Sequence, residues 1–185
     1  MELVFDTSTS RVSVALALKG ALRAEITWLT GQNQSAELLP MLLRLLDAAR
    51  AKKEDLTAIV VAKGPGSFTG LRVGMSTAKG LAYALNVPLL GVGTLEAQAL
   101  PFGPTALPLC PIQEAGRGEL AWALYQERRG QWQRLSAEHL DKPAELVAQL
   151  PGTALVCGDV SPETALTLRG LLQWPSRFLP DSRSR

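Results

Sequence analysis

A short apolar run followed by a glycine-rich turn constrains this chain more than any other stretch. The β-branched run Ala58–Ala62 is typical of a buried strand. Gly64-Pro65-Gly66 then interrupts regular structure, and Ser67 and Thr69 are residue types that cap helix N-termini. No proline follows between Gly70 and Leu85, where polar residues recur every three or four positions. The stretch therefore predicts a strand, a glycine turn and a helix, an arrangement that can present backbone amides and a helix N-terminus to an anion.

Two phosphate-binding motifs do not match this turn. A Walker A loop ends in Gly-Lys-Ser or Gly-Lys-Thr, which the stretch lacks. The dinucleotide fingerprint needs a glycine where Thr69 stands, because Gly70 comes one position late. Pro65 also has no backbone N–H to offer. The pattern favours a tight turn that packs a helix against a sheet, and it leaves Gly66 and Ser67 as candidate cofactor-binding residues.

Small residues form a ladder along the predicted helix. Gly70, Gly74 and Ala78 are spaced four residues apart and therefore share one face. A glycine inside a helix costs about 0.5–1 kcal/mol relative to alanine, so a close approach by other atoms is expected here. Two explanations stay open: the helix packs closely within its own chain, or it packs against a helix of a partner subunit.

A second predicted helix, residues 35–50, is apolar around most of its circumference, with a narrow polar stripe that includes Arg44 and Asp47. A helix of this kind is buried on more than one side. In a chain of 185 residues, we predict that the second covering surface belongs to another subunit. The predicted partner interface combines both helices and consists of Leu38, Leu39, Leu42, Leu46, Gly70, Arg72, Gly74 and Ala78.

Charge and composition exclude several classes of protein. The net charge is +2, and the last 17 residues account for +3 of it, so the rest of the chain is close to neutral. A neutral body argues against a broad nucleic-acid surface. Cys110 and Cys157 lie in apolar runs and are expected to be reduced and buried. No signal peptide and no apolar stretch of about 20 residues is visible, so we expect a cytoplasmic protein with no membrane partner.

The residues Lys63–Gly74, together with Thr77–Ala82 and Ser35–Pro40, closely resemble the TsaB (YeaZ) family of tRNA threonylcarbamoyladenosine biosynthesis proteins. That family is related to the TsaD/Kae1 proteins, once called glycoproteases. The resemblance implies an α/β, actin-like ATPase (ribonuclease H-like) fold with two lobes. Asp6 matches an aspartate that helps hold metal-bound nucleotide in that superfamily, whereas Ser8 replaces a glycine typical of its kinases. Asp6 and Ser8 are therefore further candidate cofactor-binding residues.

The expected organisation is an N-terminal lobe of residues 1–103, a shortened C-terminal lobe of residues 104–175 and a basic polar tail of residues 176–185. Three prolines and a glycine within residues 101–108 mark the boundary. The second lobe departs from the family, because Glu114-Ala115-Gly116 stands where TsaB proteins usually have Asp-Ala-Arg. Strands are expected at 2–7, 11–18, 22–29, 87–92, 107–113, 119–126, 131–136 and 154–157, and further helices at 94–100, 144–150 and 162–172. No internal repeat is visible in the sequence.

The sequence offers no catalytic residues and no metal site. TsaD relatives have a pair of metal-binding histidines in the region where this chain has Gln32–Ser35. His139 is the single histidine, placed in a predicted linker, and with two buried cysteines it cannot form a three-residue site for a soft metal. No Gly-x-Ser-x-Gly motif supports a serine nucleophile.

Three functional hypotheses follow. The resemblance implies a non-catalytic subunit that pairs with TsaD, recruits the ATPase TsaE and supports threonylcarbamoylation of adenosine 37 in tRNAs reading ANN codons. It further implies a homodimer when alone, contact with tRNA only through the complex, no cofactor of its own, and ATP or ADP only at the interface of the complex. The alternative is an independent actin-like ATP-binding enzyme or glycoprotease-like protein, for which Asp6 and Asp159 are the candidate carboxylates. A chaperone-like ATP-binding module rests on fold analogy alone.

Overall fold

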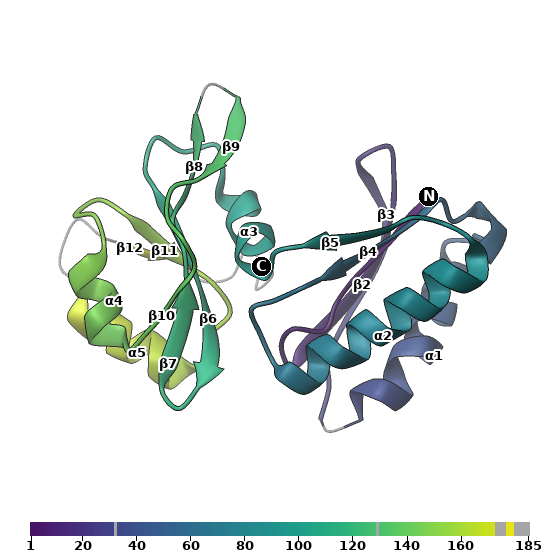
Figure 1. Cartoon of the computed structure of the whole chain (residues 1–185), viewed down its shortest axis with the longest axis horizontal. Helices are drawn as coiled ribbons and strands as arrows, with labels where there is room; N and C mark the ends of the chain where they lie inside the picture. The colour runs from purple at the N-terminus through teal and green to yellow at the C-terminus, as the bar shows by residue number, and fades with distance from the viewer. Residues whose placement is uncertain (32, 129, 173–176, 180–185) are drawn as a thin grey trace. The chain divides into compact units, whose positions relative to one another are not determined.

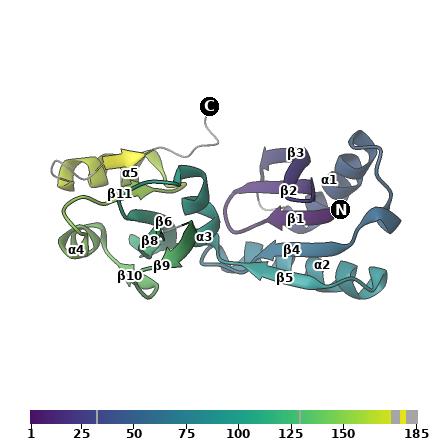
Figure 2. The same cartoon turned by 90° about the horizontal axis from the view of Figure 1, so that it is seen from above.

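The computed structural model describes residues 1–31, 33–128, 130–172 and 177–179 (Figures 1 and 2). The chain forms two compact units, Met1–Thr94 and Leu95–Arg185. No helix within the described ranges is long and apolar enough to span a membrane.

The first unit is a five-stranded mixed sheet in the order β3-β2-β1-β4-β5. The strands β1 (Glu2–Asp6), β2 (Arg11–Leu18) and β3 (Ala21–Leu29) form an antiparallel meander. The strands β4 (Ala58–Ala62) and β5 (Leu89–Val92) continue the sheet parallel to β1. The period-two pattern of β2 places Val12, Val14 and Leu16 in the core, as predicted.

Two helices cover one face of this sheet. Figures 1 and 2 show α1 (Gln34–Ala48) beside β2 and β3, and α2 (Phe68–Leu85) beside β4. A short 3₁₀ turn, Lys53–Asp55, leads into β4. The core between the helices and the sheet includes Phe5, Leu45 and Ile59, each almost fully buried.

The second unit repeats this topology although the sequence shows no repeat. Its path of strands runs β10 (His139–Asp141), β7 (Glu119–Trp122), β6 (Leu109–Gly116), β11 (Leu155–Cys157) and β12 (Arg177–Leu179). The β10–β7 and β7–β6 pairs are antiparallel, and the β6–β11 and β11–β12 pairs are parallel, as in the first unit. The helices α4 (Pro143–Gln149) and α5 (Pro162–Leu171) occupy the chain positions that α1 and α2 occupy in the first unit.

The second unit also has elements that the first lacks. The helix α3 (Thr94–Ala99) and a 3₁₀ turn, Leu100–Phe102, precede its first strand. A hairpin of β8 (Tyr125–Arg128) and β9 (Gln131–Arg134) is inserted between β7 and β10, and β8 pairs with β6. The predicted strands and helices are otherwise confirmed to within a few residues at their ends.

Three local predictions were wrong. The run 119–126 was expected to be one strand, but β7 ends at Trp122 and the Leu124 N–H donates to Ser136 Oγ (3.0 Å). The segment around His139 was expected to be a linker, but it forms β10. There the His139 ring stacks on Trp122 at 4.5 Å between centroids, and Trp122 Nε1 donates to Asp141 Oδ2 (2.9 Å). The third is β12, which pairs with β11 inside the segment expected to be a polar tail; residues 176 and 180–185 of that segment lie outside the described residues.

The division between the units falls nine residues before the predicted lobe boundary. Leu95 and Ala99 of α3 pack with Leu109, Ala123 and Tyr125 in a small buried cluster. The helix therefore shares a core with the second unit, and the proline-rich segment that follows it lies inside that unit.

Both cysteines are reduced and buried, as expected. Cys110 lies on β6 and Cys157 on the neighbouring strand β11. Burial raises the pKa of the Cys110 thiol well above its ordinary value, so the thiolate is disfavoured and the residue behaves as a core side chain.

Candidate functional site

The β1–β2 loop packs directly on the first turn of α2. Ser67 caps the helix, since its Oγ accepts a hydrogen bond from the Gly70 N–H (3.3 Å). The Ser67 N–H donates to the Ser8 carbonyl (2.7 Å), and Thr7 Oγ1 donates to the Gly70 carbonyl (2.7 Å). Thr7 and Ser8 are both buried. The loop and the helix terminus are thus one packed unit.

This contact explains three glycines. A Cβ atom at Gly66 would overlap Ser8, a Cβ at Gly70 would overlap the Thr7 carbonyl, and a Cβ at Gly74 would overlap Thr7 Oγ1. Ala78 continues the ladder into the core of the first unit. Of the two explanations that the sequence left open, packing within the chain therefore accounts for this face of α2.

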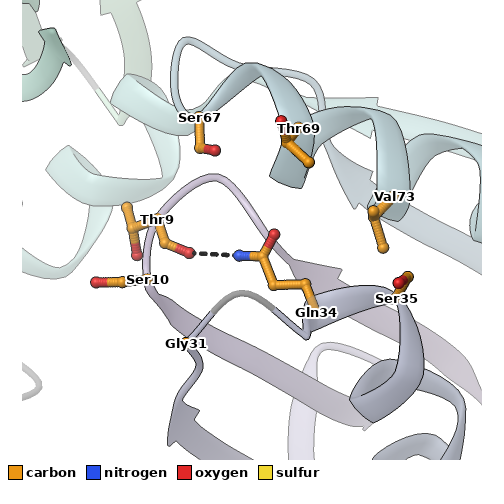
Figure 3. A pocket seen from close by; sticks show the side chains of 8 residues that line it. All are labelled: Thr9, Ser10, Gly31, Gln34, Ser35, Ser67, Thr69 and Val73. Carbon is orange, nitrogen blue, oxygen red and sulfur yellow. Dashed lines mark hydrogen bonds between the residues drawn. The ribbon is translucent and has the colours of Figure 1, made fainter.

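A cavity of about 460 Å³ lies beside this contact (Figure 3). The β1–β2 loop, the start of α1 and the start of α2 supply its lining: Thr9, Ser10, Gly31, Gln34, Ser35, Ser67, Thr69 and Val73. The Gln34 amide donates to the Thr9 carbonyl (3.1 Å), which ties α1 to the loop, as Figure 3 shows. The described residues of the lining offer hydroxyls and one amide but no charged side chain. None of them supplies a carboxylate for a metal ion or a side chain that acts as a general base.

The four candidate cofactor residues lie close to one another, but they face the cavity unequally. Asp6 Oδ1 accepts a hydrogen bond from the Ser8 N–H (2.8 Å), so the carboxylate is part of the turn itself. Ser8 Oγ is buried and has no hydrogen-bond partner among the described residues. Ser67 lines the cavity, whereas Asp6, Ser8 and Gly66 do not. Within the described part of the chain, no group of His, Cys, Asp or Glu side chains could hold a metal ion.

The eight predicted interface residues divide between the inside and the outside of the first unit. Leu38, Leu42, Gly70, Gly74 and Ala78 are buried, and Leu46 packs against the same core. Leu39 is 49% exposed and Arg72 is exposed. Of the eight, these last two are exposed, and Leu46 is partly buried.

Sequence reasoning missed the apolar residues that α1 and α2 do expose. Leu43, Phe68 and Tyr83 are 67%, 74% and 91% exposed. The Arg72 guanidinium lies over the Phe68 ring, 5.4 Å from its centroid. The sequence did contain one signal of this surface. Tyr83 lies in the polar stripe of α2, and an aromatic residue at such a position is expected to be exposed to solvent. The exposed residues Leu39 and Leu43 of α1 and Phe68, Arg72 and Tyr83 of α2 are together called the outer helix face below.

In the second unit, the carboxylate of Glu114 binds the start of α5, the helix that corresponds to α2. Glu114 Oε1 accepts hydrogen bonds from the Ser161 N–H (3.0 Å), Ser161 Oγ (2.7 Å) and Thr164 Oγ1 (2.6 Å) at the start of α5. Desolvation raises the pKa of Glu114, but the hydrogen bonds from Thr164 and Ser161 outweigh it, so its pKa lies below the ordinary 4.5. The carboxylate also suits the positive end of the helix.

Comparison with known proteins agrees with this geometry. The family model described as TsaD, tRNA N6-adenosine threonylcarbamoyltransferase, matches residues 28–159. The chain is 33% identical over 180 residues to the TsaB biosynthesis protein of Escherichia coli, a match covering 90% of this chain and 78% of that protein. It is 37% identical over 128 residues to the Bacillus subtilis TsaB protein, covering 69% of this chain and 56% of that protein.

Solved structures give the same result. YeaZ from Pseudomonas aeruginosa superposes with a TM-score of 0.79 at 27% identity, covering 97% of this chain and 83% of that one. The repeated topology of the two units and these neighbours place the chain among proteins of the actin-like ATPase fold. Within that class, the chain belongs to the TsaB (YeaZ) family.

Two glycines of α2 should respond in opposite ways to alanine. Gly74→Ala places a methyl group against Thr7 Oγ1, and we expect it to destabilise the protein by about 1–3 kcal/mol. A Cβ atom at Gly80 would meet open space, so Gly80→Ala should stabilise by about 0.5–1 kcal/mol. Urea denaturation followed by circular dichroism measures both. Equal effects of the two substitutions would contradict the assigned packing.

The Glu114 contact should make the second unit sensitive to acid. Because its folded pKa lies below the ordinary 4.5, ionised Glu114 stabilises the fold above that pH, and the stabilisation is lost as pH falls through the folded value. We expect Glu114→Gln to lower stability at pH 7 and to flatten the acid limb of the stability curve. Thermal unfolding from pH 3 to 7 measures this, and the control is Glu163→Gln, an exposed residue of α5, the helix that Glu114 contacts. An unchanged acid limb in Glu114→Gln would refute the assignment.

Proposed function

We propose that this chain is a non-catalytic subunit of the machinery that attaches a threonylcarbamoyl group to adenosine 37 of tRNAs reading ANN codons. In this proposal it pairs with TsaD, which performs the transfer, and the pair recruits TsaE. The TsaB names of its relatives support the pathway. The uncharged lining of the cavity beside α2 supports the non-catalytic role, because transfer chemistry needs an acid, a base or a metal ion.

The outer helix face carries the proposal of a partner. Tyr83 is 91% exposed, Phe68 74% and Leu43 67%, and Arg72 lies over the Phe68 ring. Aromatic rings and arginine are the residue types enriched in the centres of protein interfaces. The opposite faces of the same two helices are buried in the core of the unit. We therefore place both the TsaD contact and the homodimer contact of the isolated chain on the outer helix face rather than on the buried ladder.

Nucleotide binding by the isolated chain is not part of this proposal. Asp6 Oδ1 accepts a hydrogen bond from the Ser8 N–H, and the described residues that line the cavity include no carboxylate for a magnesium ion. ATP or ADP would then bind only where a partner completes the site. The alternative of an independent ATP-binding enzyme predicts the opposite.

Isothermal titration of the isolated chain with Mg-ATP separates these two proposals. We expect no saturable heat and no measurable ATP hydrolysis, since the described residues that line the cavity include no carboxylate to hold the magnesium ion. Binding accompanied by turnover of about 1 per second or faster, lost in Asp6→Ala, would place the chain among working enzymes.

Complementation tests the role in the cell. Removing the protein should abolish or sharply reduce N6-threonylcarbamoyladenosine in tRNA, measured by mass spectrometry of nucleosides. Restoring it as Asp6→Ala or His139→Ala should keep the modification. Leu43→Asp or Tyr83→Asp should abolish it, because an unpaired charge in a desolvated interface costs several kcal/mol.

A matched control comes from the second unit. Leu166 on α5 is 67% exposed, the same fraction as Leu43, and Leu166→Asp should leave the modification intact. Active outer-face variants together with an inactive Asp6→Ala would overturn the scaffold proposal and favour a catalytic one.

A further inference from the structure

The β8–β9 hairpin is an addition that the first unit lacks. It leaves the sheet after β7 and returns at β10, so it is inserted between the second and third strands of the repeated topology. Figure 1 shows it extending past the rest of the second unit's sheet. β9 pairs with β8 alone among the described strands.

The register gives the hairpin two different faces. Tyr125 lies opposite Arg134 and Glu127 opposite Trp132, so these residues share one face. On that face Tyr125 and Trp132 stack with centroids 6.0 Å apart and pack on the cluster of α3. Arg134 on the same face pairs with Glu138 at 3.5 Å. This face anchors the hairpin to its unit.

The opposite face is uniformly polar and carries no carboxylate. Gln126 lies opposite Gln133, and Arg128 lies opposite Gln131. Gln126 is fixed, since its amide donates to the Ala106 carbonyl (2.7 Å). Arg128 Nε in turn donates to Gln126 Oε1 (2.9 Å), which orients the guanidinium. Arg128, Gln131 and Gln133 are exposed.

The hydrogen-bond donors on this polar face are available to a ligand. Beyond the bond from Nε, the Arg128 guanidinium makes no hydrogen bond to another described residue, and the Gln131 and Gln133 amides make none either. Arginine and glutamine side chains are common donors to nucleic-acid phosphates and sugars.

We propose that the face formed by Gln126, Arg128, Gln131 and Gln133 contacts the phosphate backbone of an RNA strand, namely the tRNA brought to the complex. This inference rests on the proposed function for the identity of the RNA. Positive charge on a face that carries no carboxylate matches the uniform negative charge of the backbone. One oriented arginine and two amides make a small contact, which fits a chain whose body is close to neutral and which meets RNA only within an assembly.

The test measures tRNA binding by the complex of this chain with TsaD. Arg128→Ala should weaken the affinity on the order of fivefold near 0.1 M salt and reduce the slope of log K against log salt by about 1. Gln131→Ala with Gln133→Ala should weaken the affinity with little change in slope. Arg134→Ala, which removes the same charge from the opposite face of the hairpin, is the matched control and should bind tRNA like the wild type.

Each result is decisive. Affinity unchanged in Arg128→Ala, or lowered equally in Arg134→Ala, would overturn the RNA-binding face while leaving the proposed function standing. Loss of TsaD pairing in Arg128→Ala would assign the face to a protein contact and also overturn the inference. Failure of the wild-type chain to pair with TsaD would instead refute the proposed function, and co-purification detects this before any tRNA is added.

Discussion

The contact between the β1–β2 loop and the glycines of α2 determines how the first unit is arranged. Thr7 reaches into the space that side chains at Gly70 and Gly74 would fill, and the Ser8 carbonyl accepts a hydrogen bond from the N–H of Ser67, the N-cap residue of the helix. Buried backbone groups are costly when they lack partners, so this loop can be buried only because the helix satisfies it. The three glycines lose conformational entropy on folding, and this cost is offset by a contact that larger residues would prevent.

That contact also decides which surface of the helices is available. Because the small-residue ladder faces inward, α2 turns Phe68, Arg72 and Tyr83 outward. α1 follows the same division, with Leu38 and Leu42 inside and Leu39 and Leu43 outside. The second unit repeats the topology but holds α5 with the Glu114 carboxylate in place of a loop carbonyl. In the first unit α2 is therefore held by packing against the backbone of a loop, and in the second unit α5 is held by a charged side chain.

Local patterns predicted most of the fold, and long-range contacts account for the rest. The β-branched run before α2 and the serine cap after it are encoded within a few residues, and both were predicted. The face of α1 that meets the core could not be chosen, because leucines at 38, 39, 42 and 43 look alike in sequence. β10 is only His139–Asp141, and it forms because Trp122 offers both a ring to stack on and an indole N–H. Glu114 meets Ser161 across 47 residues, a separation that no spacing rule detects.

The central claim is that the outward surface of α1 and α2 is the partner surface, and hydroxyl-radical footprinting tests it most directly. The chain would be labelled alone at a concentration that keeps it monomeric, and again with saturating TsaD. Tyr83 and Phe68, exposed at 91% and 74%, should lose most of their labelling in the complex, whereas Leu166 on α5, exposed at 67%, should keep it. Full labelling of Tyr83 and Phe68 in a complex that has demonstrably formed, or protection confined to Leu166, would contradict the account.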